Sequence, residues 1–173
     1  KFYAVATNCL NGKPAFFERD HSDILLAARA SASMPLLSRF VQIDGVPYLD
    51  GGVADSIPLI HAMEKGYRKN VVILTRNKGY RKKKPGKSTP VYVAAFRHYP
   101  ELLNTLYNRY RNYNRTLELI EKWEQEGHIF VIRPELPAVG RAETNKDKLM
   151  DFYQHGYGVM KERYEELQAY LHS

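Results

Sequence analysis

An Asp-Gly pair between two short apolar runs is the feature that most restricts how this chain can fold. Asp44 and Gly45 separate the run Phe40–Ile43 from the run Val46–Leu49. An Asp-Gly pair between two apolar runs is the strongest short-range signal of a hairpin with a two-residue turn. The sequence therefore predicts an antiparallel hairpin over residues 40–49.

The returning strand of this hairpin ends at a second Asp-Gly pair, in the tripeptide Asp50-Gly51-Gly52. Because Asp44 is explained by the turn, Asp50 is the carboxylate that remains as a candidate for chemistry. The two glycines after it allow a neighbouring segment to approach the backbone closely. The alternative is that Asp50 is only a turn or capping residue, and the tripeptide alone leaves this open.

The rest of the chain alternates between strand and helix patterns, and its 173 residues fit one domain with a substantial core. The run Val71–Leu74 is continuously apolar, which is typical of a strand buried on both faces. Strands separated by helices predict a three-layer α/β/α fold with a mostly parallel sheet. Further strands are expected at 2–7, 14–18 and 128–132, and helices at 24–33, 58–66, 100–126 and 145–171.

The positive charge of the chain is concentrated in one segment. The chain has 26 Lys and Arg against 19 Asp and Glu, a net charge of +7. Because the segment 76–90 is rich in Gly, Pro and Lys and has no acid, we expect a basic exposed loop. It is either a solvated insertion or a surface for anions, such as lipid headgroups or nucleic-acid phosphates. Its basic residues are Arg76, Lys78, Arg81, Lys82, Lys83, Lys84 and Lys87, and the run 81–84 is the candidate anion-binding site.

The helix expected at 100–126 interleaves tyrosine with arginine. Tyrosines beside arginines are typical of sites for single-stranded nucleic acid, whereas tyrosine at helical spacing also forms a packed face. A basic nucleic-acid or anionic-surface binding module without catalysis is therefore the alternative to an enzyme. The residues concerned are Tyr107, Arg109, Tyr110, Arg111, Tyr113 and Arg115.

Several classes of protein are disfavoured by the composition. No apolar run approaches the ~18 residues of a membrane span. The single cysteine, Cys9, cannot form an internal disulfide and indicates a reducing compartment, so we expect a cytoplasmic protein. The histidines show no metal-ligand spacing, and Gly86-Lys87-Ser88 lacks the first glycine of a phosphate-binding loop. We expect neither a metal nor a cofactor.

Three features in a fixed order resemble the second half of the patatin-like phospholipase domain. A small-residue helix ends in Ser31-Ala32-Ser33-Met34-Pro35, the hairpin follows, and Asp50-Gly51-Gly52 precedes Pro58. The resemblance is clearest over residues 1–75. Beyond them, Arg133, Pro134, Arg141, Leu149, Tyr153 and Gly156 look like the tail of a bacterial subgroup.

The resemblance implies a fold, a reaction and a partition of the chain. Residues 1–75 would be the C-terminal half of the hydrolase domain, 76–90 the basic loop, and 91–173 an extension that completes it. Asp50 would be the base of a Ser–Asp dyad, and Gly51 and Gly52 would shape its turn. The substrate would be a phospholipid or another acyl ester, at a peripheral position on an anionic membrane.

No serine of this chain lies in the G-x-S-x-G pattern of a nucleophile elbow. The resemblance therefore implies that the serine and the oxyanion loop belong to an N-terminal half upstream of Lys1. We expect the full-length protein to be a lipid acyl hydrolase and the fragment alone to be inactive. The open sheet edge of the fragment would be covered by the missing half or by self-association.

Overall fold

The computed structural model describes residues 1–86, 89–140 and 143–173, so Lys87, Ser88 and Arg141 of the patterns above lie outside it. The chain forms two compact units, and each is built from two separate stretches. The first unit contains residues 1–58 and 82–117, and the second contains 59–81 and 118–173.

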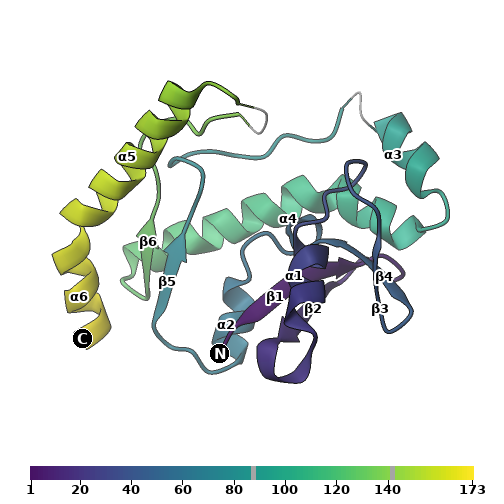
Figure 1. The fold of residues 1–173 in the computed structure, drawn as a ribbon. Helices are drawn as coiled ribbons and strands as arrows, with labels where there is room; N and C mark the ends of the chain where they lie inside the picture. The colour runs from purple at the N-terminus through teal and green to yellow at the C-terminus, as the bar shows by residue number, and fades with distance from the viewer. Residues whose placement is uncertain (87–88, 141–142) are drawn as a thin grey trace. The chain divides into compact units, whose positions relative to one another are not determined.

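The first unit is organised around a four-stranded sheet of order β2-β1-β4-β3 (Figure 1). Its strands are β1 (Tyr3–Asn8), β2 (Pro14–Glu18), β3 (Val41–Ile43) and β4 (Val46–Asp50). The hairpin predicted at 40–49 is confirmed as β3 and β4, which pair antiparallel. Its turn residues Asp44 and Gly45 have φ of 51° and 76°, the positive values that a type I′ turn requires.

The prediction of a mostly parallel sheet is wrong for this unit, since all its neighbouring strands are antiparallel. For the pairs β1–β2 and β3–β4, the physical reason is the length of the connections. Only a short turn with Gly12 at a φ of 68° joins β1 to β2, and two residues join β3 to β4. Such connections can only return the chain beside itself, because a parallel pair needs a crossover of a dozen or more residues.

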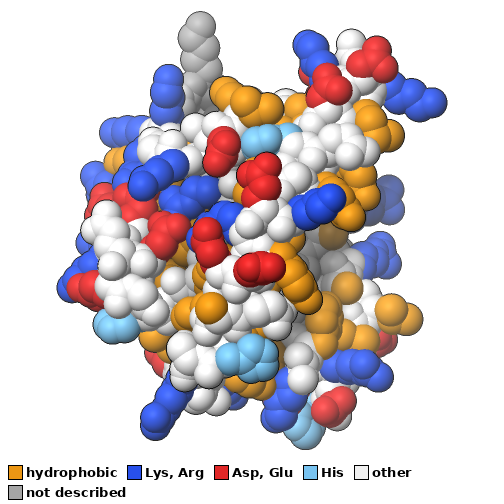
Figure 2. Space-filling model, turned by 90° about the vertical axis from the view of Figure 1, so that its left-hand side faces the viewer, with side chains coloured by type: hydrophobic (Ala, Val, Ile, Leu, Met, Phe, Trp, Pro, Cys, Tyr) orange, Lys and Arg blue, Asp and Glu red, His pale blue; other side chains and the backbone are white. Residues whose placement is uncertain are grey.

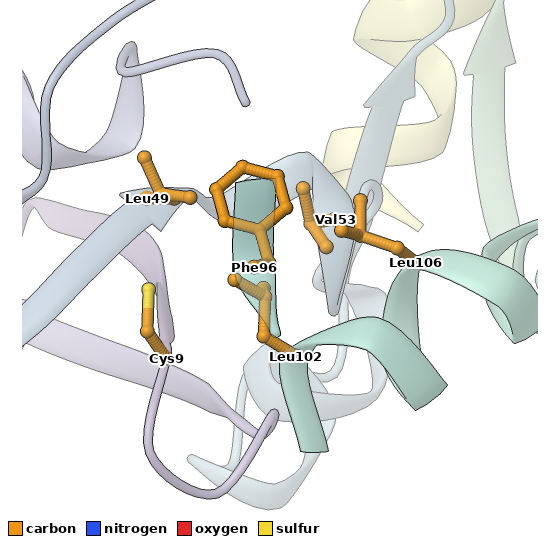
Figure 3. Close-up of a cluster of buried hydrophobic side chains, with 6 residues drawn as sticks. All are labelled: Cys9, Leu49, Val53, Phe96, Leu102 and Leu106. Carbon is orange, nitrogen blue, oxygen red and sulfur yellow. The ribbon is translucent and has the colours of Figure 1, made fainter. Parts of the chain in front are cut away.

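Helices cover both faces of this sheet, so the three-layer order itself is present. On one face, Ala30 of α1 (Ile24–Ser31) packs with Ala6 and Tyr48. On the other face, Leu49 of β4 contacts side chains of α3 (Thr89–Phe96) and of α4 (Pro100–Gln125). The short helix α3 was not expected from the sequence. Figure 3 shows the second cluster, which contains Cys9, Leu49, Val53, Phe96, Leu102 and Leu106.

The N-terminal part of α4 also contacts the turn between β1 and β2. Thr105 donates a hydrogen bond of 2.8 Å to the carbonyl oxygen of Gly12, a residue 93 positions earlier in the chain. A side chain at position 12 would place its Cβ 2.5 Å from the carbonyl oxygen of Glu101. Glycine is therefore needed here both for the positive φ and for the close approach of the helix.

The second unit contains the parallel pair β5 (Asn70–Ile73) and β6 (Ile129–Ile132). All four residues of β6 are buried. The prediction that the run at 71–74 is buried on both faces is wrong, since Val71 is 38% exposed and Ile73 is 72% exposed. An apolar run does not reveal whether a second layer covers its outer face, and in β5 only alternate side chains point inward.

Helices α2 (Leu59–Glu64), α5 (Lys146–Glu162) and α6 (Tyr164–His172) complete this unit. The single helix expected at 145–171 is divided at Arg163, whose ψ of 8° departs from helical geometry. Its guanidinium donates to the carbonyl oxygen of Val131 at 2.6 Å and lies 4.5 Å from the ring centroid of Phe130. The contacts that accompany this break come from β6, which is distant in sequence.

The side of the molecule that carries α5 and α6 has a mixed surface (Figure 2). Acidic and basic side chains are interspersed there with exposed apolar ones. The exposed large apolar residues of α5 are Leu149, Met150, Tyr153 and Tyr157.

Candidate active site

Asp50 is the last residue of β4, where it lies opposite Ala6 of β1. Its backbone N–H donates to the carbonyl oxygen of Ser33 at 2.7 Å, just after α1. Its carboxylate Oδ1 accepts a hydrogen bond of 2.7 Å from the N–H of Gly52. Asp50 thus caps a short 3₁₀ turn over Gly51–Val53, and this cap fixes the orientation of its carboxylate.

Gly51 sits where the turn crosses β1. An added Cβ at this position would lie 2.1 Å from the carbonyl oxygen and 2.6 Å from the carbonyl carbon of Val5. Both are backbone atoms of a sheet strand, which cannot move aside as a flexible side chain can. The first glycine of the tripeptide is therefore required by this close approach.

Thr7 joins the end of β4 to the turn that follows it. Its buried hydroxyl donates to the carbonyl oxygen of Asp50 at 2.8 Å and accepts from the N–H of Ala54 at 3.1 Å. One side chain thereby satisfies backbone groups on both sides of the turn. Sequence reasoning missed Thr7, because a threonine inside a strand pattern carries no signal of a partner 43 residues away.

The carbonyl oxygen of Gly52 accepts two further hydrogen bonds. Ser56 Oγ donates to it at 2.7 Å, and Arg109 Nε of α4 donates to it at 2.6 Å. A charged donor makes the stronger type of hydrogen bond, so Arg109 anchors the turn to the helix. From the sequence, this arginine was a candidate for nucleic-acid binding, and its partner lies 57 residues away.

An open cavity of about 350 Å³ lies beside this turn. The turn contributes Gly51, Gly52 and Asp55 to its wall, and the end of α1 contributes Ser31. Phe2 and the start of β1, residues 3–5, form the rest of the lining together with neighbouring small residues. The half-exposed Asp50 thus ends a rigid strand next to a concave surface, which is where a reacting group can be held in a fixed geometry.

The basic segment is held against α4 at its centre. In the second unit, Arg81 makes a two-pronged ion pair with Glu121, at 3.1 and 2.6 Å. In the first unit, the backbone of Lys82 exchanges two hydrogen bonds with the side chain of Asn114, and its Nζ lies 4.0 Å from the ring centroid of Tyr113. Arg81 and Lys82 are half-buried, whereas Lys83 and Lys84 are exposed.

These contacts do not favour the nucleic-acid interpretation of α4. The Nζ of Lys82 already lies over the ring of Tyr113, and the Nζ of Lys84 lies 5.3 Å from the ring centroid of Tyr107. Arg109 is engaged with Gly52. The stacking surfaces that single-stranded nucleic acid would need are thus used by the chain itself.

The ion pair of Arg81 with Glu121 predicts a pH-dependent contribution to stability. Hydrogen bonds from the Arg81 guanidinium lower the pKa of the Glu121 carboxyl. A lowered pKa in the folded state adds stability above the unfolded value of about 4.3, and this stability is lost as the pH falls through the folded pKa. Because both side chains are partly exposed, we expect Glu121→Gln to lower the free energy of unfolding by less than ~1 kcal/mol at pH 7.

The loss of unfolding free energy caused by Glu121→Gln should disappear below the pKa that Glu121 has in the folded state, because Glu121 is itself protonated there. Urea unfolding at a series of pH values measures this difference. Glu162→Gln, an exposed substitution in α5, is the matched control and should differ little from the unchanged protein at any pH. An equal cost of Glu121→Gln at pH 3 and pH 7 would contradict the assignment.

Cys9 follows β1 and is completely buried in the cluster of Figure 3. Burial raises the pKa of its thiol to about 12. A thiol with this pKa stays protonated at neutral pH and is a poor nucleophile. The structure therefore places Cys9 among the packing residues of the core rather than in the candidate site.

Two kinds of feature are absent from the part of the chain that the structure describes. Across residues 1–86, 89–140 and 143–173, no cluster of three or more His, Cys, Asp or Glu side chains is arranged to hold a metal ion. In the same ranges, no helix combines the length and the hydropathy needed to cross a membrane.

Comparisons with known proteins match two separate parts of the chain. Residues 99–172 match a domain family of unknown function, DUF6363. A relative described as "Uncharacterized protein YjjU", from Escherichia coli (strain K12), is 36% identical over 75 residues. That match covers 43% of this chain and 21% of the relative. Residues 5–63, which include Asp50, the glycine turn and the hairpin before it, match the patatin-like phospholipase family.

Proposed function

We propose that the full-length protein is a serine-type lipid acyl hydrolase in which Asp50 is the base of a Ser–Asp dyad. The observation that carries the proposal is the carboxylate of Asp50, which accepts from the N–H of Gly52 at a turn whose two glycines line an open cavity. It lies within the stretch that matches the patatin-like phospholipase family. A match to this family implies hydrolysis of lipid acyl esters.

In the proposed reaction, the Oδ1 of Asp50 continues to accept the hydrogen bond from the N–H of Gly52. Its other carboxylate oxygen, Oδ2, accepts a hydrogen bond from the hydroxyl of the serine. The serine oxygen attacks the ester carbonyl carbon while its proton passes to Asp50. The tetrahedral intermediate then expels the alcohol, which takes the proton from Asp50. Water attacks the resulting acyl-serine ester, again with Asp50 as base, and the acid leaves with the serine restored.

Two serines that are hydrogen-bonded around this turn do not fit the role of nucleophile. Ser33 Oγ donates to the carbonyl oxygen of Arg29 at 2.8 Å, and Ser56 Oγ donates to that of Gly52 at 2.7 Å. Both hydroxyls are thus turned toward backbone oxygens, and neither lies in a G-x-S-x-G elbow. We therefore assign the nucleophile to sequence outside residues 1–173, so that this chain alone does not turn over substrate.

The test compares the full-length protein with the chain 1–173. A fluorophosphonate probe, which forms a covalent bond with activated serines, should label the full-length protein at one serine outside residues 1–173. The full-length protein should also hydrolyse a water-soluble p-nitrophenyl ester, and the chain 1–173 should do neither. Labelling of a serine within residues 1–173, with hydrolysis by this chain alone, would overturn the assignment.

A further inference from the structure

The helix α3 presents a continuous apolar surface to solvent. None of its eight residues is charged, and it is anchored by Phe96, which is 5% exposed. Val91 is 54% exposed and Val93 is 50% exposed. The remaining exposed residues of the helix, Pro90, Ala94 and Ala95, are apolar as well. A contiguous exposed patch of this kind marks a surface that contacts something other than water.

Positive charges flank this helix on both sides. Lys83 and Lys84 precede it and Arg97 follows it, and all three are exposed. The sequence contains no Asp or Glu between Glu64 and Glu101. The exposed apolar face is therefore bordered by cations without neighbouring acids in the chain, and it is complementary to a surface that is apolar inside and anionic at its boundary.

An apolar cavity of about 280 Å³ lies on the same part of the first unit. α3 contributes Tyr92 and Val93 to its wall, and α4 contributes Leu103, Leu106 and Tyr107. The exposed Lys84 lies over the ring of Tyr107 at the same place. Apolar side chains with a lysine beside them suit an acyl chain whose headgroup is anionic.

We propose that α3, together with Lys83, Lys84 and Arg97, is a docking surface for an anionic lipid bilayer. The apolar side chains of α3 enter the boundary between headgroups and acyl chains, and the flanking cations contact the phosphates. We take the occupant to be a bilayer because the flanking charges, Lys83, Lys84 and Arg97, are all positive, which matches a uniformly anionic surface. The proposal does not depend on Asp50 chemistry, since docking requires no turnover.

Co-sedimentation of the full-length protein with phosphatidylcholine vesicles, with and without phosphatidylglycerol, tests this surface. We expect binding to the anionic vesicles and a large loss of it in Val91→Asp. Lys83→Gln/Lys84→Gln should weaken binding roughly 30-fold, which corresponds to ~1 kcal/mol for each lysine. These residues are exposed, so the variants should fold normally, and thermal unfolding checks this.

Two control variants make the comparison specific. Met150→Asp changes a residue of α5 that is 56% exposed, close to the exposure of Val91. Lys65→Gln/Lys146→Gln removes two exposed charges elsewhere in the chain. Both controls should bind like the unchanged protein. Equal loss of binding in the α3 variants and in the controls, or equal binding to neutral and anionic vesicles, would overturn the proposal.

A fluorescent probe on Val91→Cys distinguishes a bilayer from a protein cover. Since Cys9, the single cysteine of residues 1–173, is completely buried, an environment-sensitive label should attach within these residues at position 91 alone. Its emission should shift to the blue on addition of anionic vesicles, and brominated lipids should quench it. A probe that is already shielded in the full-length protein without lipid would show that another part of the protein covers α3, and would refute the proposal.

Failure of this proposal is separable from failure of the proposed reaction. Hydrolysis of a water-soluble ester needs no bilayer, so that activity should be unchanged in Val91→Asp. Vesicle binding, in turn, should be unchanged in a variant of Asp50 that has lost activity.

Discussion

Replacement of Asp50 by asparagine should abolish ester hydrolysis by the full-length protein and leave its fold intact. Asparagine retains an oxygen that accepts from the N–H of Gly52, so the cap of the turn over Gly51–Val53 persists. It cannot take a proton from the serine. Loss of a general base lowers turnover by roughly 10²- to 10⁴-fold, and kcat for a p-nitrophenyl ester measures this loss.

The same substitution separates the two interpretations of Asp50 that the sequence left open. If Asp50 were only a capping residue, Asp50→Asn would retain full activity, and that result would contradict its role as base. Asp55→Asn is the matched control, since Asp55 lines the same cavity and has no part in the proposed reaction. Asp50→Ala removes the cap as well, so it should lose stability in addition to activity.

Gly51→Ala should destabilise the first unit more than most single substitutions, by about 3 kcal/mol or more. The added methyl group would lie 2.1 Å from the carbonyl oxygen of Val5. Relief requires β1 or the end of β4 to shift, which disturbs the hydrogen bonds that Thr7 makes to both sides of the turn. Urea unfolding of the protein with and without the substitution measures the effect.

Gly52→Ala is the control for this prediction. Its added methyl group would meet the Oδ1 of Asp50 at 3.0 Å and the Nη2 of Arg109 at 3.3 Å, which are side-chain atoms that can move. We expect a clearly smaller loss of stability than in Gly51→Ala. Unfolding free energies that are the same for both variants would show that the approach of Val5 does not require glycine.

Elements with a local cause were predicted correctly from the sequence. The hairpin at 40–49 follows from the backbone preferences of Asp44 and Gly45, and the helix at 100–126 follows from its own apolar periodicity. The direction of the other strands was predicted from a pattern over the whole chain instead. It was inferred wrongly from the alternation of strands and helices, although the short turn at Gly12 forces β1 and β2 to be antiparallel.

The residues of the candidate site also differ in whether the sequence alone could identify them. Asp50, Gly51 and Gly52 stand out because their motif is contiguous, and whether Asp50 is catalytic stays a prediction. The residues that hold this turn, Thr7 and Arg109, are separated from it by 43 and 57 positions. Contacts of this range depend on the assembled fold, so one sequence contains no pattern that identifies them.

The contact of Thr105 with Gly12 has a consequence for how the protein is made. The 93 positions between these residues take roughly 5 to 20 s to synthesise at 5–20 residues per second. Within that interval there is a period when β1 to β4 have been synthesised but α3 and the start of α4, which cover Leu49 and Cys9, have not. A nascent chain of this protein therefore exposes one apolar sheet face for several seconds, which makes it a natural client for a chaperone that works beside the ribosome.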